Sequence, residues 1–427
     1  MKSKLLLLYY TFMVLILVLY TNMSNSPNLI VRFGYLAALV LPLLNKVELY
    51  PVVIICTLGI SKNTFAYPFM PTEMYYYVIL SLVFGVMALM RQNGQTNIKP
   101  LFIIVLFYIG FNDLILQGEL SSLVTVVFLC IMFFVCMEKK EEVGNQILPY
   151  SFILISLAVS YWALFCPEAL NRSYNKVGDM QQTGWMDPNY LSAVLGMGLV
   201  VSIRELLGGD KKLLSKVVLI LTAIGSVLTL LQLASRGIIL AVLVSILFLI
   251  SFSRVNKWVK TTIFVIAVVF VVFLYSNAYF DFVLARFEAD DGTGSHRTEI
   301  WVSKLNDFFS LENPLHWLFG VGQSEGVKLG EYFGLSVKGV STHNDFVSVL
   351  IYYGFVGVIL LFAVIAYPLR ICSRQIRPQI VALLIYLLLC SMSIEPLAHG
   401  NFVYLSFFFY IIQLARQSQQ SILANEE

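Results

Sequence analysis

The stretch of sequence that decides the fold lies at residues 216–252 and reads KVVLILTAIGSVLTLLQLASRGIILAVLVSILFLISF. It contains two apolar runs, 216–234 and 237–252, which are separated only by Ser235 and Arg236. Each run approaches the roughly 20 apolar residues that a helix needs to cross a bilayer. The runs are continuous rather than alternating, so they predict helices and not barrel strands. This stretch therefore predicts a tight hairpin of two transmembrane helices.

Similar apolar runs fill much of the remaining chain. Of its 427 residues, 59% are hydrophobic and 12% are charged, whereas about a quarter of a soluble domain is charged. The run at 47–61 is short and contains Pro51, so we predict an all-α integral membrane protein with roughly 12 to 14 transmembrane helices. The further runs are 5–21, 29–45, 47–61, 72–90, 99–116, 120–137, 147–165, 188–207, 260–276, 343–366, 378–394 and 401–415. No small-residue cleavage site follows the first run, which we interpret as a retained span.

The positions of lysine and arginine predict the orientation in the membrane. Basic residues are enriched in cytoplasmic connections. When the N-terminus is placed in the cytoplasm and the runs alternate, 18 of the 28 basic residues fall inside. Both termini are then cytoplasmic, and two long segments, 166–187 and 277–342, lie outside. Loops of such length usually carry a function, so we expect the functional site on the outer face.

These runs and loops divide the chain into five parts. We expect N-terminal transmembrane helices at 1–165 and an outer loop at 166–187. Central transmembrane helices follow at 188–276, and a large outer loop containing short helices at 277–342. Residues 343–427 form the C-terminal transmembrane helices and a short cytoplasmic tail.

Ten basic residues remain on the outer side, against the usual bias, and half of them are arginines. The planar guanidinium group suits bidentate binding of phosphate. Arg236 is notable because its hairpin holds a cation at membrane depth, which is a functional hypothesis by default. The alternative is an arginine that extends toward lipid head groups. The ten residues are Arg32, Lys62, Arg172, Lys176, Arg236, Arg286, Arg297, Lys304, Lys328 and Lys338.

All four histidines also fall outside, and His343 stands where the large loop returns to the membrane. Imidazole titrates near neutral pH and is the usual general base. Asn344 and Asp345 are placed to orient its ring. The alternative is an ordinary helix start, in which Thr342 or Asn344 caps the next helix and the histidine is merely nearby.

Four stretches of the chain resemble motifs of the O-antigen polymerase and O-antigen ligase superfamily of bacterial membrane glycosyltransferases. Each motif is weak alone, but their order and common outer location are typical of the family. They are Gly184-Trp185-Met186-Asp187-Pro188-Asn189-Tyr190-Leu191, then Ser235-Arg236-Gly237, then Arg297 with Trp301 and Phe319-Gly320-Val321-Gly322, and finally Thr342-His343-Asn344-Asp345-Phe346 with Tyr353-Gly354-Phe355-Val356-Gly357.

This resemblance implies transfer of a glycan from a polyprenyl diphosphate carrier to a sugar hydroxyl, in the bacterial cytoplasmic membrane. It implies no metal, nucleotide or other cofactor. The net charge of +3 is too small to indicate a nucleic acid partner. Arg236 and Arg297 would hold the diphosphate, and His343 would be the base. Arg172 and Arg286 are further candidates for substrate binding, as are Trp301, Asn344 and Asp345. Membrane lipids, a chain-length regulator and a flippase are the implied partners.

Three functions remain open at this point. A polymerase joins glycan blocks on the lipid carrier, and we favour it as the family's commoner activity. A ligase transfers the finished glycan to lipid A core or protein. A glycolipid transporter or flippase would show ionisable groups within spans and repeat symmetry, and neither is clear in the sequence.

Overall fold

The computed structural model describes residues 100–116, 141–165, 173–175, 180–182, 188–208, 211–281, 283–284, 297–330, 341–395, 397 and 402–426. The five predicted spans within 5–90 and 120–137 lie outside the described residues. The same holds for two candidate site residues, Arg172 and Arg286.

Every predicted span within the described residues is a helix, which confirms the all-α class. Three of them, Asn189–Leu207, α9 and α16, are long and apolar enough to cross a membrane. The helices at these runs are α5 (Pro100–Leu116), α7 (Glu141–Phe165), α8 (Pro188–Leu207), α9 (Leu213–Leu233), α10 (Arg236–Phe252), α11 (Lys257–Ser276), α16 (Asp345–Ile371), α17 (Arg377–Ser391) and α18 (Phe402–Glu426).

The loop at 277–342 contains the expected short helices, α13 (Arg297–Phe309), α14 (Pro314–Phe319) and α15 (Gln323–Gly326). Two features differ from the sequence expectation. The segment at 166–187 contains an antiparallel ribbon of β1 (Ser173–Asn175) and β2 (Met180–Gln182), whose strands are too short to show a periodic pattern. Helix α18 continues 11 residues beyond its apolar run, because its polar end contains no glycine or proline to stop it.

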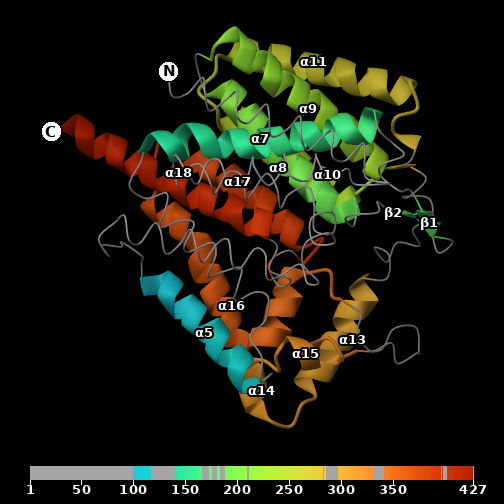
Figure 1. The fold of residues 1–427 in the computed structure, drawn as a ribbon, viewed down its shortest axis with the longest axis vertical. Helices are drawn as coiled ribbons and strands as arrows, with labels where there is room; N and C mark the ends of the chain where they lie inside the picture. Colours follow the sequence, from blue (N-terminus) through green and yellow to red (C-terminus); the bar gives the residue numbers. More distant parts are fainter. Residues whose placement is uncertain are drawn as a thin grey trace, which may run out of the picture.

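The helices form a bundle with the short loop helices gathered at one end (Figure 1). Helix α7 packs on α8 and α9, α10 packs on α17 and α8, and α16 packs on α18 and α17. Aromatic side chains fill the centre, where the rings of Phe152 and Phe407 meet edge to face at 5.3 Å. Helix α5 lies along α16, and α14 packs against the same helix (Figure 1).

Helix α16 is kinked at Gly354, which has φ 62° and ψ −166°. A positive φ of this kind favours glycine, which has no Cβ. The loop helix α14 also approaches closely here, since a Cβ on Gly354 would lie 2.3 Å from the carbonyl oxygen of Leu318. The Gly354 motif is thus explained by backbone geometry.

The kink removes helical partners from the backbone carbonyls that precede it. Buried carbonyls need other donors, and the Phe319-Gly320-Val321-Gly322 motif supplies two of them. The N–H of Val321 donates to Ile351 (2.9 Å), the N–H of Gly322 donates to Tyr352 (3.1 Å), and the hydroxyl of Tyr108 on α5 donates to Tyr353 (2.6 Å). The two motifs are separated by 30 residues in the sequence. At the kink they are therefore connected by backbone hydrogen bonds.

Candidate functional site

The hairpin between α9 and α10 is built from three consecutive residues with distinct roles. Helix α9 ends at Ala234 in the left-handed conformation, with φ 51°, and Arg236 begins α10. Between them, the Ser235 hydroxyl donates a hydrogen bond to the side-chain oxygen of Asn189 at 2.8 Å. This bond ties the Ser-Arg-Gly hairpin to the Pro-Asn start of α8.

The same hairpin packs against the segment that follows α17. A Cβ on Gly237 would lie 2.1 Å from the hydroxyl oxygen of Ser393, so only glycine allows this approach. Arg297 reaches the same residue from α13, where its Nη1 donates to the Ser393 carbonyl at 2.7 Å. Ser393 is therefore the point at which the Arg236 hairpin and the Arg297 helix meet.

Helix α13 also holds the turn that carries His343. Trp301 lies one helical turn after Arg297, so both side chains project from one face of α13. The indole N–H of Trp301 donates to the carbonyl of Thr342 at 2.6 Å. One helix face thus positions two other segments, Ser393 through Arg297 and the His343 turn through Trp301.

His343 adopts a left-handed backbone conformation, with φ 52°. This region is uncommon for residues other than glycine, although histidine enters it more often than most. Such strained residues cluster at functional sites. The next residue, Asn344, caps α16, since its side-chain oxygen accepts from the N–H groups of Phe346 (3.0 Å) and Val347 (3.4 Å). Capping is thus the role of Asn344, while His343 precedes the helix in a separate, fixed turn.

Glu395 organises this turn and was given no role in the sequence analysis. Its carboxylate is fully buried, next to the segment that contacts both arginine elements. An acid at the end of an apolar run is only a weak sequence signal, and the hydrogen-bond partners of Glu395 are what give it a role. Its carboxylate accepts hydrogen bonds from the hydroxyls of Ser341, Thr342 and Ser348, the last at 2.6 Å, and from the N–H of Asn344 at 3.4 Å.

Lys304 is a second buried charge, and it holds α13 against α15. Its ammonium donates to the carbonyls of Gly326 (3.1 Å) and Val327 (3.0 Å). Burial lowers the pKa of this lysine to about 8, against the opposing effect of Glu395 and Asp307. Lys304 therefore holds the loop helices together. Counting the basic residues on the outer side could not separate this structural role from a role in binding phosphate.

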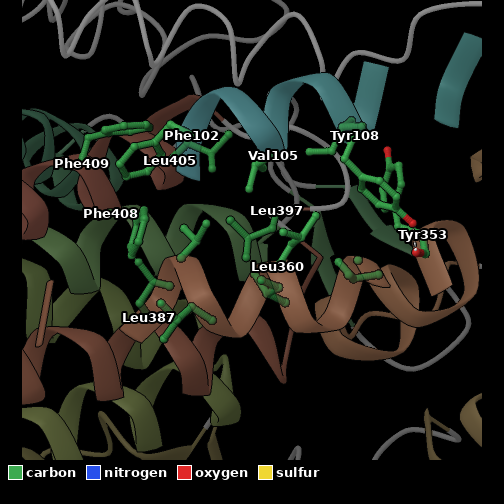
Figure 2. A pocket seen from close by; sticks show the side chains of 16 residues that line it. Phe102, Val105, Tyr108, Tyr353, Leu360, Leu387, Leu397, Leu405, Phe408 and Phe409 are labelled. Atoms are coloured by element: carbon green, nitrogen blue, oxygen red, sulfur yellow. Dashed lines mark hydrogen bonds between the residues drawn. The ribbon is translucent and has the colours of Figure 1, made fainter. Parts of the chain in front are cut away.

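An apolar cavity adjoins this polar cluster. Asp345 is buried, and its Oδ1 accepts from the N–H of Leu397 at 2.9 Å. Leu397 in turn lines a cavity of about 120 Å³ between α5, α16, α17 and α18. Side chains such as Phe102, Leu360 and Phe408 point into it from these helices (Figure 2). The site therefore combines a polar end with a wholly apolar neighbour.

The structure brings most of the candidate residues together around residues 393–397. Arg236, Arg297, Trp301, His343, Asn344 and Asp345 all lie on elements that contact this segment directly or through Thr342. The arrangement brings the elements that carry two arginines and a histidine next to an apolar cavity. The chemical roles of these residues remain predictions.

Comparison with known proteins supports the relationship that the motifs indicate. Residues 219–362, a third of the chain, match the family model described as O-antigen ligase. The match contains Arg236, Arg297 and His343, and it confirms the resemblance to the O-antigen polymerase and ligase superfamily. A comparison with curated proteins finds no match. Glu395 lies outside the matched residues and outside the four motifs, so it enters the site through the structure alone.

Proposed function

We propose that this member of the O-antigen polymerase and ligase superfamily polymerises oligosaccharide repeat units that are linked to polyprenyl diphosphate. The reaction would occur on the outer face of the bacterial cytoplasmic membrane. The observation that carries this proposal is the meeting of the Arg236 hairpin, the Arg297 helix and the His343 turn at Ser393 and Glu395.

The leaving group of such a reaction is a diphosphate, which develops negative charge as the glycosidic bond breaks. Fixed cations stabilise that charge most strongly where water is scarce. Arg297 is fixed by its bond to the Ser393 carbonyl, and Arg236 is fixed at the start of α10. Both residues would bind diphosphate oxygens through guanidinium N–H groups, without requiring a metal for this stabilisation.

The acceptor is a sugar hydroxyl, which must lose a proton as it attacks. In the proposed step, the hydroxyl oxygen bonds to the anomeric carbon of the donor glycan and its proton passes to a ring nitrogen of His343. The bond from the anomeric carbon to the diphosphate breaks, and its electron pair leaves on polyprenyl diphosphate. This direct displacement inverts the anomeric centre.

The apolar cavity supports a lipid-linked donor. Cavities of ~150 Å³ that are lined by apolar side chains hold a benzene-sized molecule, and one isoprene unit is of similar size. The cavity next to Leu397 is about 120 Å³ and has aromatic and aliphatic walls. We propose that it holds one isoprene unit of the carrier, with the diphosphate directed toward Arg236 and Arg297.

Polymerase and ligase activities use the same donor, and a deletion strain separates them. Loss of a polymerase leaves a surface glycan of a single repeat unit with no ladder. Loss of a ligase leaves no surface glycan and an accumulation of long lipid-linked chains. We expect the single-repeat pattern on a glycan gel, and a normal ladder would contradict both activities.

A further inference from the structure

A polar cavity lies at the end of the bundle opposite the candidate site. Helix α8 begins at Pro188, where Asn189 bonds to Ser235, and carries Arg204 15 residues after Asn189. A rise of ~1.5 Å per residue places Arg204 about 22 Å further along the helix axis. The cavity here measures about 210 Å³ and is lined by residues of α7, α8 and α18 and by Lys211.

Among the described residues that line this cavity, basic side chains exceed acidic ones by one. Glu205 is the single acid that lines it, among two basic residues. One carboxylate oxygen of Glu205 accepts from Nη1 of Arg204, and the other accepts from the ammonium of Lys211 at 2.6 Å. Both oxygens of the acid are therefore occupied, and the net charge of the three side chains is positive.

The guanidinium of Arg204 is fixed by hydrogen bonds, but it keeps N–H donors for a further ligand. Its Nε donates to the side-chain oxygen of Gln379 at 3.1 Å, and its Nη1 also donates to the hydroxyl of Tyr410 at 2.7 Å. Within the described part of the chain, no residue accepts a hydrogen bond from its Nη2. Since the Tyr410 oxygen accepts from arginine, its own proton is left to donate elsewhere.

Two amides add further donors to the same cavity. Gln413 is nine-tenths buried, lines the cavity, and makes no hydrogen bond to another described residue. The Nε2 atom of Gln417 is buried without a partner among the described residues. Leaving a buried donor without a partner is unfavourable. The cavity thus combines a positive charge with several unused donors, which is the complement of a small oxyanion.

We propose that this cavity binds a phosphate group. Phosphate is negatively charged and offers only acceptor oxygens, and charge-assisted bonds to arginine are the strongest that such a group forms. The cavity lies near the ends of membrane helices, where basic pockets bind phospholipid head groups. The shared chemistry is phosphate, supplied by an anionic phospholipid head group or by the free ion. This site is separate from the proposed transferase site.

The test measures binding to the full-length protein, purified in a neutral detergent. One arm adds phosphatidylglycerol, with diacylglycerol as the control that lacks phosphate. The other adds inorganic phosphate, with sodium chloride at equal ionic strength as its control. The readouts are the unfolding temperature and, for the lipid, the amount retained in native mass spectrometry. We expect a phosphate-bearing ligand to raise the unfolding temperature while its control does not. The arm that responds identifies the source of the phosphate.

Variants locate the binding to the cavity. Gln417→Glu replaces a donor with a negative charge and should weaken binding by about tenfold or more, equivalent to at least ~1.4 kcal/mol. Gln375→Glu is the matched control, since Gln375 is exposed near the same end of the bundle but does not line the cavity. Gln413→Leu removes a donor without adding charge and gives an independent second variant. The proposal is overturned if neither ligand binds, or if both cavity variants bind like wild type.

Discussion

At the scale of single residues, Gly237, which follows Arg236, and the guanidinium of Arg297 approach Ser393 from different elements. We expect Arg297→Ala to lower the transfer rate by roughly 10²- to 10³-fold, as does removal of one preorganised donor from an active site. Arg236→Lys should also lose most activity, because an ammonium cannot bind two phosphate oxygens in one plane. The measurement is the transfer rate per folded molecule.

Lys328→Ala serves as the control for both arginine variants. Lys328 is exposed, and within the described residues it pairs only with Glu325, three residues before it. Such surface pairs contribute about 0 to 1 kcal/mol. Its loss should leave transfer unchanged. Wild-type rates in both arginine variants would show that neither cation contributes to substrate binding or transfer.

His343 allows a test that separates chemistry from backbone geometry. Its φ of 52° suits asparagine as well, so His343→Asn should keep the turn while removing the base. We expect a normal amount of folded protein and a loss of turnover of roughly 10²- to 10⁴-fold. The wild-type rate should also fall as the pH drops, because a protonated imidazole cannot act as a base. Substantial turnover in the asparagine variant would mean that another residue takes the proton.

Glu395 is expected to act by holding the His343 turn. Glu395→Gln keeps the size of the side chain but replaces one acceptor oxygen with a donor, where hydroxyls of Ser341, Thr342 and Ser348 converge. Hydrogen bonds to charged groups contribute about 1.5 to 3 kcal/mol, so turnover should fall about tenfold or more as the turn loosens. Glu312→Gln, on an exposed side chain, should have no effect. If Glu395→Gln retains full turnover, the carboxylate does not position this turn.

At the scale of elements, the kink in α16 joins the loop helices to the bundle. Gly354→Ala would place a Cβ about 2.3 Å from the Leu318 carbonyl and impose a left-handed conformation on alanine. The conformational strain alone is about 1 to 3 kcal/mol, so we expect a lower unfolding temperature in detergent. Ile359→Ala is the control, because Ile359 is exposed on the same helix. Equal unfolding temperatures for wild type and Gly354→Ala would show that α14 can move away freely.

The positions of the helices could be predicted from the sequence, whereas the kink and the contacts between helices could not. Continuous apolar runs predict spans because lipid permits few other structures, and all such runs within the described residues are helices. The kink at Gly354 depends on donors from Val321 and Tyr108, which are distant in the sequence. A length rule contains no information about such long-range pairing.

The candidate site also contains some residues that could be proposed from the sequence and others that could not. Arg236, Arg297 and His343 could be proposed because cations and an imidazole outside the membrane are chemically unusual. Ser393 and Glu395 could not, since a serine and an acid at the end of a span gain meaning only through their partners. The structure supplies those partners, the Arg297 guanidinium for Ser393 and the hydroxyls around His343 for Glu395.

At the scale of the whole molecule, two polar centres lie at opposite ends of one bundle. The candidate site occupies the end where α8 and α10 begin, and the proposed phosphate pocket occupies the end where α8 stops. The lysine and arginine pattern predicts the outer face for the first and the cytoplasmic face for the second. In this predicted orientation the candidate site faces the outer leaflet, from which a lipid-linked substrate would enter.

The most direct test of the central claim uses purified protein and a polyprenyl-diphosphate-linked repeat unit. The wild-type enzyme should lengthen the lipid-linked glycan and release one polyprenyl diphosphate for each linkage formed. Arg297→Ala, which loses the guanidinium fixed at Ser393, should do neither. If wild type leaves the repeat units unchanged, or if Arg297→Ala lengthens them equally well, the account of this site as a glycan polymerase is contradicted.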